Sequence, residues 1–376
     1  MLRVDLLRRL TSSLNLLRVY LLISLISVAI ALALFEVYAH INNDKFYSYG
    51  WQVDNITKEK IESCRANSSA KKVVAVFGSS MVEFYGEAKQ NLVTQLNKKS
   101  SNNEYFCNFG VSGAGIPVFI SRFKRAIKEN LRMDAAVFYF SEGNGFMDFI
   151  DHSPKPANRY DDTTDRKLSA LNRLIKSTYA INIIYRNVLK PLFFRTHYSD
   201  ERVVRDIFSR SYYKEVTLED AIERVKNTPK EQLDKFESDL LNKSWYEVAL
   251  MSPNYFRRIH HPDRDEFIKQ KEIVFGDIEV IKSLCQENKI RCNIVIIPQD
   301  FFLFEETKND WINTFRFNPY SGQGPSDIAN SIVANYTFSY YPAGLFQIAD
   351  FIRYDGHLTE SGSEKLADYT YKLISK

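Results

Sequence analysis

Short apolar runs, each bounded by turn residues, set the pattern of the chain after about residue 70. The runs are VVAVF (73–77), the weaker YFCNF (105–109), AAVFYF (135–140) and, much later, CNIVII (292–297). Segments with helix-like spacing accompany them at roughly 83–97, 117–130 and 266–288. Strands that are apolar throughout are typical of parallel sheets covered by helices on both faces. The pattern therefore predicts an α/β fold in three layers, α/β/α, with a central parallel sheet.

Two parts of the chain after residue 70 depart from this alternation. Between about 150 and 262 the chain is rich in charged and aromatic residues, with helical patches and no clear strand. We expect a mostly helical insertion there, packed over one end of the sheet, within a single domain of residues 71–376. The last stretch, SGSEKLADYTYKLIS, begins with the capping-box spacing of Ser361 and Glu364, which predicts a closing helix.

A long apolar segment near the N-terminus predicts a membrane anchor. No charged residue occurs from Val19 to Phe35, and with its neighbours this segment reaches the ~20 residues that a helix needs to cross ~30 Å of hydrocarbon. Four arginines precede it, so the positive-inside bias places residues 1–18 in the cytoplasm. We predict a transmembrane helix over 19–39, a polar linker over 40–70 and an extracytoplasmic domain, in the periplasm or at the cell surface. A cleaved signal peptide ending near Ala31-Leu32-Ala33 is the alternative, although the apolar region of a signal is usually about 7–15 residues long.

The composition narrows the classes of function. Of the 376 residues, 45% are hydrophobic and 14% aromatic, which is enough for a sizeable core. The net charge is only +4, and no basic block with interleaved aromatic residues occurs. Nucleic-acid binding is therefore not expected.

The cysteines and histidines indicate no metal site. Cys64, Cys107, Cys285 and Cys292 form no CxxC pair and no zinc-binding pattern. The last two flank an expected helix-to-strand turn, where they form either a disulfide in an oxidising compartment or a pair of ordinary, semi-buried thiols. The adjacent His260 and His261 lack the H-E-x-x-H pattern, so they are expected to be turn or surface histidines. No metal or organic cofactor is called for.

The first apolar run ends in Gly78-Ser79-Ser80, at the corner between the expected strand and a helix. In an open parallel sheet, ligands bind beyond the carboxyl ends of the strands, which is where this corner lies. This stretch alone leaves three interpretations open. Ser80 caps the helix in a capping box with Glu83, or the corner cradles a phosphate although the pattern G-x-x-x-x-G-K-[ST] is absent, or Ser80 is a nucleophile.

Three further blocks follow the expected strands or precede the last helix. The chain reads NFGVSG (108–113) after the second run, SEGNGF (141–146) after the third and YDGHLTESG (354–362) before the closing helix. We expect all of them to lie at the same edge of the sheet as Ser80. Glu142, within the second block, either approaches this edge or is a solvated turn residue.

Together these blocks resemble those of the SGNH (GDSL-type) hydrolase family, which is named for its signature Ser, Gly, Asn and His. The resemblance covers roughly residues 70–145 and 280–376 and implies the flavodoxin-like SGNH fold, in its membrane-anchored, extracytoplasmic branch. The residues that match the family's blocks are Ser80, Gly113, Asn144, Asp355 and His357.

The resemblance implies a role for each of these residues. Ser80 would be the nucleophile, at a strand-to-helix turn where the helix N-terminus favours negative charge. His357 would take its proton and later return one to the leaving alcohol, while Asp355 would orient the imidazole. The N–H groups of Ser80 and Gly113 and the amide of Asn144 would form the oxyanion hole, where each donor is typically worth ~10²–10³ in rate.

The chain departs from the family's pattern in three places. Ser79 stands where the family has Asp, so a supporting hydrogen bond would be made differently. Gly145 follows Asn144 where the family usually has Asp. The terminal block is Asp-x-His, not Asp-x-x-His, and this leaves a Ser–His dyad without Asp355 as a variant. Similar departures occur in membrane-anchored relatives that modify envelope polysaccharides, including proteins of teichoic acid D-alanylation.

Anchoring and resemblance together predict a serine esterase that acts through an acyl-enzyme. Its expected substrate is an O-acyl ester, in the first place O-acetyl, of a cell-surface glycan or glycolipid. An O-acetyltransferase of envelope polysaccharides and a catalytically inactive, SGNH-like glycan-binding or assembly protein are the alternatives. The expected partners are the acylated glycan or glycolipid, the membrane through the single N-terminal helix, and an envelope-biosynthesis membrane protein.

Overall fold

The computed structural model describes residues 19–20, 22–24, 26–38, 56–68, 71–83, 91–100, 104–111, 114–143, 146, 201, 204–205, 208, 215–230, 250–260, 262–315, 322–352 and 356–375. The chain divides into two units. One comprises Met1–Val53 with Leu168–Phe194, and the other comprises Asp54–Lys167 with Arg195–Lys376. The second unit contains the sheet and the candidate site.

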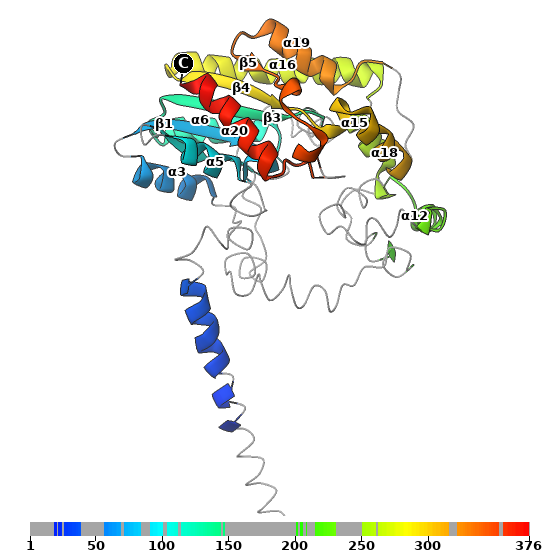
Figure 1. The fold of residues 1–376 in the computed structure, drawn as a ribbon, viewed down its shortest axis with the longest axis horizontal. Coiled ribbons are helices and arrows are strands. Elements are labelled where there is room, and N and C mark those ends of the chain that lie inside the picture. The colour runs from blue at the N-terminus through cyan, green and yellow to red at the C-terminus, as the bar shows by residue number, and fades with distance from the viewer. Residues whose placement is uncertain are drawn as a thin grey trace, which may run out of the picture. The chain divides into compact units, whose positions relative to one another are not determined.

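A parallel five-stranded sheet forms the centre of the second unit (Figure 1). Its strands are β1 (Lys72–Gly78), β2 (Glu104–Asn108), β3 (Ala135–Ser141), β4 (Arg291–Ile297) and β5 (Ser339–Tyr340). They lie in the order β2-β1-β3-β4-β5, and every neighbouring pair is parallel. The first four match the apolar runs to within one residue, while the two-residue β5 was not expected. The predicted α/β class and parallel sheet are confirmed.

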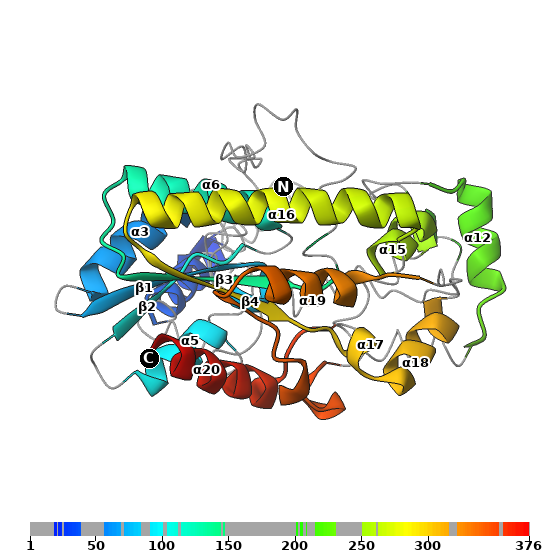
Figure 2. The same cartoon turned by 90° about the horizontal axis from the view of Figure 1, so that it is seen from above.

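Helices cover both faces of the sheet (Figure 2). On one face lie α6 (Ile116–Lys128) and α16 (Arg264–Glu287), and on the other α5 (Leu92–Lys99) and α20 (Glu360–Ile374). Buried side chains of α3 (Ile56–Asn67) and α19 (Pro325–Asn335) join the same core cluster as α6 and α16. The arrangement is consistent with a three-layer α/β/α fold.

Alternate residues of β1 explain why this strand is apolar throughout. Val73, Ala75 and Phe77 belong to the core under α6 and α16, whereas Val74 and Val76 belong to the core under α5 and α20. Successive strand residues point to opposite faces, so a strand covered on both sides needs an apolar residue at every position.

The remaining helices of the described residues are short or peripheral. Within the range expected as an insertion, α12 (Leu218–Lys226) and α15 (Pro253–His260) are helical, and no strand occurs among the residues that the structure describes there. The other elements are α4 (Ser80–Glu83), α17 (Asp300–Leu303), α18 (Glu305–Phe315) and the 3-10 helices η5 (Ala343–Leu345) and η6 (Ile348–Asp350).

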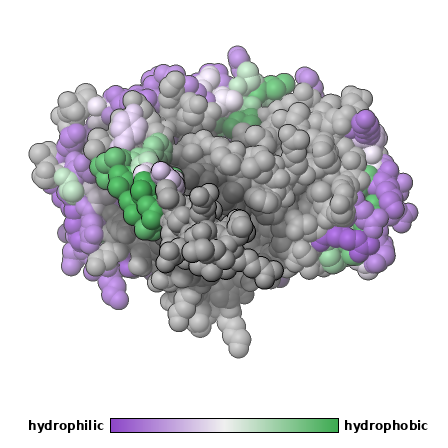
Figure 3. Space-filling model, turned by 90° about the horizontal axis from the view of Figure 1, so that it is seen from below, coloured by the Kyte–Doolittle hydropathy of each residue, from purple (hydrophilic) through white to green (hydrophobic). Residues whose placement is uncertain are grey.

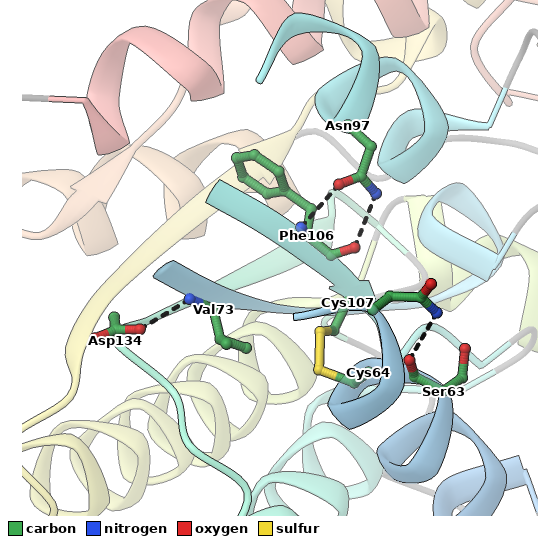
Figure 4. The surroundings of a disulfide bond; sticks show 8 residues. Ser63, Cys64, Val73, Asn97, Phe106, Cys107 and Asp134 are labelled. Atoms are coloured by element: carbon green, nitrogen blue, oxygen red, sulfur yellow. Dashed lines mark hydrogen bonds between the residues drawn. A yellow bond between two sulfur atoms is a disulfide. The ribbon is translucent and has the colours of Figure 1, made fainter. Parts of the chain in front are cut away.

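Part of the range expected as a linker belongs to the folded domain. Helix α3 lies within residues 40–70, and its Ile61 and Cys64 are almost fully buried in the core. Cys64 forms a disulfide with Cys107 of β2, with 5.5 Å between their Cα atoms (Figure 4). On the other side of this edge strand, the Asn97 side chain donates to the carbonyl oxygen of Phe106 and accepts from its N–H, both at 2.9 Å. The disulfide and Asn97 thus hold β2 from two directions.

The second disulfide joins Cys285, near the end of α16, to Cys292 in β4, with 6.1 Å between their Cα atoms. Of the two sequence-based alternatives for this pair, the structure has the disulfide. The Cys64–Cys107 pairing was not predicted, because residues 43 positions apart become neighbours only through the packing of α3 on β2.

The predicted closing helix exists, but its predicted cap was wrong. Helix α20 begins after Thr359, whose hydroxyl accepts from the N–H of Gly362 at 3.3 Å. The hydroxyl of Ser361, the expected cap, donates instead to the Asp350 carboxylate at 2.8 Å. A tertiary hydrogen bond has therefore replaced the local one.

The first unit contributes a helical segment. Its described residues between 19 and 38 are helical, and most of the exposed large apolar side chains of the described residues lie in this range. Among the residues that the structure describes, no helix is both long and apolar enough to span a membrane.

In the view of Figure 3 the described surface is mostly hydrophilic, with its hydrophobic residues gathered in small patches.

Candidate functional site

The candidate site lies at the carboxyl ends of β1 and β3. These strands are neighbours in the sheet although β2 lies between them in the sequence, so the direction of winding reverses at this point. Helix α6 covers one face, and α5 covers the other. Such a switch point leaves a crevice between diverging connections, where ligands of doubly wound sheets bind.

Ser80 is the first residue of α4, immediately after β1. The N–H groups of Val82 and Glu83 both donate to the carbonyl oxygen of Ser79 at 3.0 Å. In a capping box the Glu83 N–H would instead bind the Ser80 hydroxyl. The Ser80 side chain is therefore not used as the predicted cap.

The Ser80 hydroxyl lies against an imidazole from the far end of the chain. Ser80 Oγ and His357 Nε2 are 2.6 Å apart, across 277 positions of sequence. Both residues are partly exposed, so a ligand can reach them. When neutral imidazole carries its proton on Nδ1, Nε2 accepts the hydrogen bond from the hydroxyl, as a general base for Ser80 requires.

A short antiparallel loop presents His357. Phe351 and Leu358 form an isolated bridge, and the N–H of Ile352 donates to the carbonyl oxygen of His357 at 2.7 Å. Gly356, directly before the histidine, has φ of +74°, a left-handed conformation that glycine adopts without strain. These backbone contacts hold the segment that carries His357 against Phe351 and Ile352.

Asp350 holds the base of this loop. Its buried carboxylate accepts from Lys365 Nζ at 2.6 Å, from Ser361 Oγ at 2.8 Å and from the N–H of Gln347 at 2.8 Å. Burial alone would raise the Asp350 pKa, but these hydrogen bonds outweigh it and hold the pKa below its ordinary value. The first turn of α20 is thereby tied to the loop that carries His357.

Ser79 links the first block to the third. Its Oγ lies 3.0 Å from Oγ of Ser141, the last residue of β3, and both side chains are buried. Ser79 stands where the resembled family has Asp. In this chain a pair of hydroxyls makes the connection between the neighbouring strand ends.

The second block packs directly on α4. A Cβ atom at Gly110 would lie 2.4 Å from the amide nitrogen of Glu83, so no other residue fits there without moving the helix. The Asn108 side chain donates to the carbonyl oxygen of Val82 at 3.0 Å and accepts from the N–H of Gly110 at 2.8 Å. Sequence reasoning singled out Gly113 in this block and missed Gly110, although both glycines stand in NFGVSG.

Three of the predicted site residues, Gly113, Asn144 and Asp355, lie outside the residues that the structure describes. Their neighbours are described. Gly143 has φ of +74°, and a Cβ there would lie 3.1 Å from Oε1 of Gln299. A Cβ at Gly356 would lie 3.7 Å from Nε2 of the same residue. The buried Gln299, which the sequence did not single out, therefore lies between the Asn144 block and the His357 loop.

Glu142 is buried at this edge, not solvated. Its carboxylate accepts from Ser326 Oγ at 2.5 Å, from the Tyr341 hydroxyl at 3.0 Å and from the N–H of Gln299 at 3.2 Å. Burial raises the Glu142 pKa to about 7, against the opposing effect of these three donors. The carboxylate joins the end of β3 to the end of β4, to α19 and to the residue after β5.

The described residues thus pair a hydroxyl with an imidazole at the edge where open parallel sheets commonly bind ligands. Neither group needs a metal ion to act, since serine–histidine pairs perform nucleophilic acyl transfer by proton exchange alone. No protein-family model matches the chain, and no curated protein is significantly similar to it. The family membership stays a prediction.

Proposed function

We propose that this chain is a serine esterase of the SGNH type, which hydrolyses O-acyl esters through an acyl-enzyme. The observation that carries the proposal is the 2.6 Å contact between Ser80 Oγ and His357 Nε2. Its place supports the same conclusion, because the contact lies beyond the carboxyl ends of parallel strands at the switch point between β1 and β3.

In the proposed reaction, Ser80 Oγ attacks the acyl carbon while its proton passes to His357 Nε2. The resulting oxyanion would be stabilised by backbone N–H groups near Ser80, with Gly113 and Asn144 as the further donors. Collapse of the tetrahedral species breaks the bond to the alcohol oxygen, which leaves with the proton from His357. Water then gives its proton to the same nitrogen and attacks the acyl-enzyme. Collapse of this second tetrahedral species breaks the bond to Ser80 Oγ, which takes that proton from His357, and releases the carboxylic acid.

We further propose that the domain lies outside the cytoplasm, anchored by the apolar segment of residues 19–39. Two disulfides support this compartment, because disulfides persist in oxidising environments and are rare in the cytosol. The substrate class follows from the same location, and we propose O-acetylated surface glycans or glycolipids. An alkaline carbonate wash tests the anchor, since a spanning chain stays in the membrane pellet and a peripheral one is released.

Labelling with a fluorophosphonate probe tests the nucleophile in the full-length protein. We expect one equivalent of probe on the wild type, no labelling of Ser80→Ala, and strongly reduced labelling of His357→Ala. The rate of aryl acetate hydrolysis should likewise be highest in the wild type, strongly reduced in His357→Ala and absent in Ser80→Ala. Thr94→Ala is a useful control, because Thr94 lies in the first turn of α5 and, among the described residues, its side chain bonds to Asn91, the cap of the same helix.

Wild-type protein that resists the probe while retaining its fold would contradict the esterase and favour the inactive, glycan-binding alternative. Labelling without turnover of aryl acetate would instead indicate an enzyme that needs a sugar hydroxyl as acceptor. Repeating the assay with an added glycan separates these two cases, because hydrolysis and transfer share the acyl-enzyme and differ in the group that attacks it.

A further inference from the structure

Helix α3 places a lysine against Glu83 and Gly110, beside the candidate site. Lys60 Nζ donates to the carbonyl oxygen of Gly110 at 2.7 Å and lies 3.9 Å from Glu83 Oε1. Gly110 belongs to the block after β2, and Glu83 is the last residue of the helix that begins at Ser80. One ammonium group therefore contacts both α4, which begins with the proposed nucleophile, and the loop after β2 that packs on α4.

These two segments already pack closely. The missing side chain of Gly110 lets its backbone approach the amide of Glu83, and Asn108 bonds the carbonyl oxygen of Val82. Lys60 adds a third interaction between the same two segments, because it donates to the carbonyl oxygen of Gly110 and pairs with the Glu83 carboxylate. A shift of the Gly110 loop would therefore move α4, and with it the Ser80 hydroxyl relative to His357.

The Cys64–Cys107 disulfide holds Lys60 in this place. Cys64 follows Lys60 by four positions in α3, so both side chains lie on the same face of the helix. Cys107 precedes Gly110 by three positions. The covalent bond and the lysine hydrogen bond thus run side by side from one face of α3 to the end of β2 (Figure 4 shows the disulfide).

The environment of Lys60 is unusual for a lysine. Its side chain is 21% exposed, and burial lowers its pKa from 10.5 to about 8, while the Glu83 carboxylate opposes this shift and the guanidinium of Arg122 in α6 adds to it. At neutral pH the ammonium is therefore still charged beside Glu83. Glu83 and the carbonyl oxygen of Gly110 are thus the partners that this half-buried ammonium needs.

We propose that Lys60 is a positioning residue, which the Cys64–Cys107 disulfide holds against Gly110 and which keeps the helix beginning at Ser80 in its reactive placement. This inference rests on the proposed esterase function. It makes α3, which the sequence presents as part of a polar linker, a support of the active site.

The experiment compares the rate of fluorophosphonate labelling of Ser80 in full-length variants. Lys60→Met keeps the length of the side chain and removes the charged donor, and we expect labelling to slow by about tenfold or more, because small displacements of reacting groups have effects of this size. Lys60→Arg, which retains a charged donor, should recover most of the rate. With an ester substrate, the loss in Lys60→Met should fall on kcat, with KM little changed.

Two matched controls separate this effect from a general loss of stability. Lys99 is also 21% exposed and ion-paired, with Asp368 at 2.6 Å, but it lies in α5 on the other face of the sheet, so Lys99→Met should label like the wild type. Replacing Cys64 and Cys107 by Ser should slow labelling as Lys60→Met does. The same replacement of Cys285 and Cys292 should not, because β4, which carries Cys292, is separated from β1 by β3.

Hydrogen exchange at residues 80–83 and 108–111 provides a readout that does not depend on the chemistry. We expect faster exchange there in Lys60→Met and not in Lys99→Met. Equal labelling and equal exchange in wild type and Lys60→Met would overturn the positioning role. Absence of labelling in the wild type, with faster exchange in Lys60→Met, would instead overturn the esterase and leave the contact of Lys60 supported.

Discussion

At the scale of single residues, the site is held by short polar contacts between strand ends. Ser79 and Ser141 are the clearest case, since two buried hydroxyls 3.0 Å apart join the first block to the third. Each satisfies the other, so the loss of one leaves its partner buried without that hydrogen bond.

We therefore expect a double-mutant cycle at this pair to show strong coupling. Ser79→Ala and Ser141→Ala should each lower the free energy of unfolding by about 1–3 kcal/mol, because each leaves an unsatisfied hydroxyl. The double variant should lose clearly less than the sum of the two. Urea unfolding measures all four free energies, and strictly additive losses would show that the hydrogen bond contributes nothing.

Glu142 makes the stability of the domain depend on pH. Its pKa is raised from 4.5 to about 7 in the folded protein, so the folded state binds a proton that the unfolded state has lost between these values. The free energy of unfolding should therefore fall as pH rises from 4.5 to 7, by roughly 3 kcal/mol from this group alone. Glu142→Gln should remove that component.

Urea unfolding at several pH values between 5 and 8 compares the two proteins. The difference in stability between wild type and Glu142→Gln should change steeply across this range. Glu279→Gln serves as the control. The hydrogen bond from Lys282 is the largest of the effects that hold the pKa of the exposed Glu279 below its ordinary value, so Glu279 stays ionised throughout this pH range. Parallel curves for wild type and Glu142→Gln would contradict the raised pKa.

At the scale of elements, the placement of α4 depends on the close approach of Gly110. A methyl group there would lie 2.4 Å from the Glu83 nitrogen, a backbone atom that cannot rotate away. Gly110→Ala should therefore lower the free energy of unfolding by about 1–3 kcal/mol, the usual range for overpacking, and should slow labelling of Ser80 because α4 must shift.

Gly276 provides the matching control for this substitution. It lies within α16, and a Cβ there meets none of the described atoms within 4 Å. Gly276→Ala should stabilise the domain by about 0.5–1 kcal/mol, because alanine loses less backbone entropy in a helix. Thermal or urea unfolding of both variants checks the opposite signs, and similar effects of the two would refute the close contact at Gly110.

At the scale of the whole molecule, the two disulfides differ in how far along the chain they reach. Cys64 and Cys107 are 43 positions apart, whereas Cys285 and Cys292 are 7 apart. Closing the longer loop removes more entropy from the unfolded chain. Replacing the first pair by Ser should lower the free energy of unfolding by about 4 kcal/mol and replacing the second by about 2 kcal/mol. Guanidinium unfolding of the two double variants measures this, and equal losses would contradict the loop-length argument.

The sheet could be predicted from the sequence because its strands are buried on both faces. Burial of this kind leaves continuous apolar runs, and these located β1 to β4 to within one residue. Strand β5 has only two residues, too few to form a run. Helix α3 was assigned to a linker because it is mostly polar, and only where it packs, as at Ile61 and Cys64, does it contribute to the core.

The candidate site could be predicted in part. Ser80 and His357 were singled out by their short motifs, and the structure brings their side chains together. Lys60 and Gln299 were not, because neither stands in one of these motifs. Ser141 belongs to the block SEGNGF, but its contact with Ser79 was not predicted. The cap at Ser361 was wrong for a related reason, since Asp350 competes for that hydroxyl from outside the helix.

Elements with a local cause could be predicted from the chain alone: strands from apolar runs, helices from spaced apolar residues, and turns from glycines. The tertiary structure alone decided the contacts between distant segments: the hydroxyl beside the imidazole, the cysteine of α3 beside that of β2, and the lysine beside Gly110. The physical reason is that periodicity records which face of an element is buried. It does not record which other element covers that face.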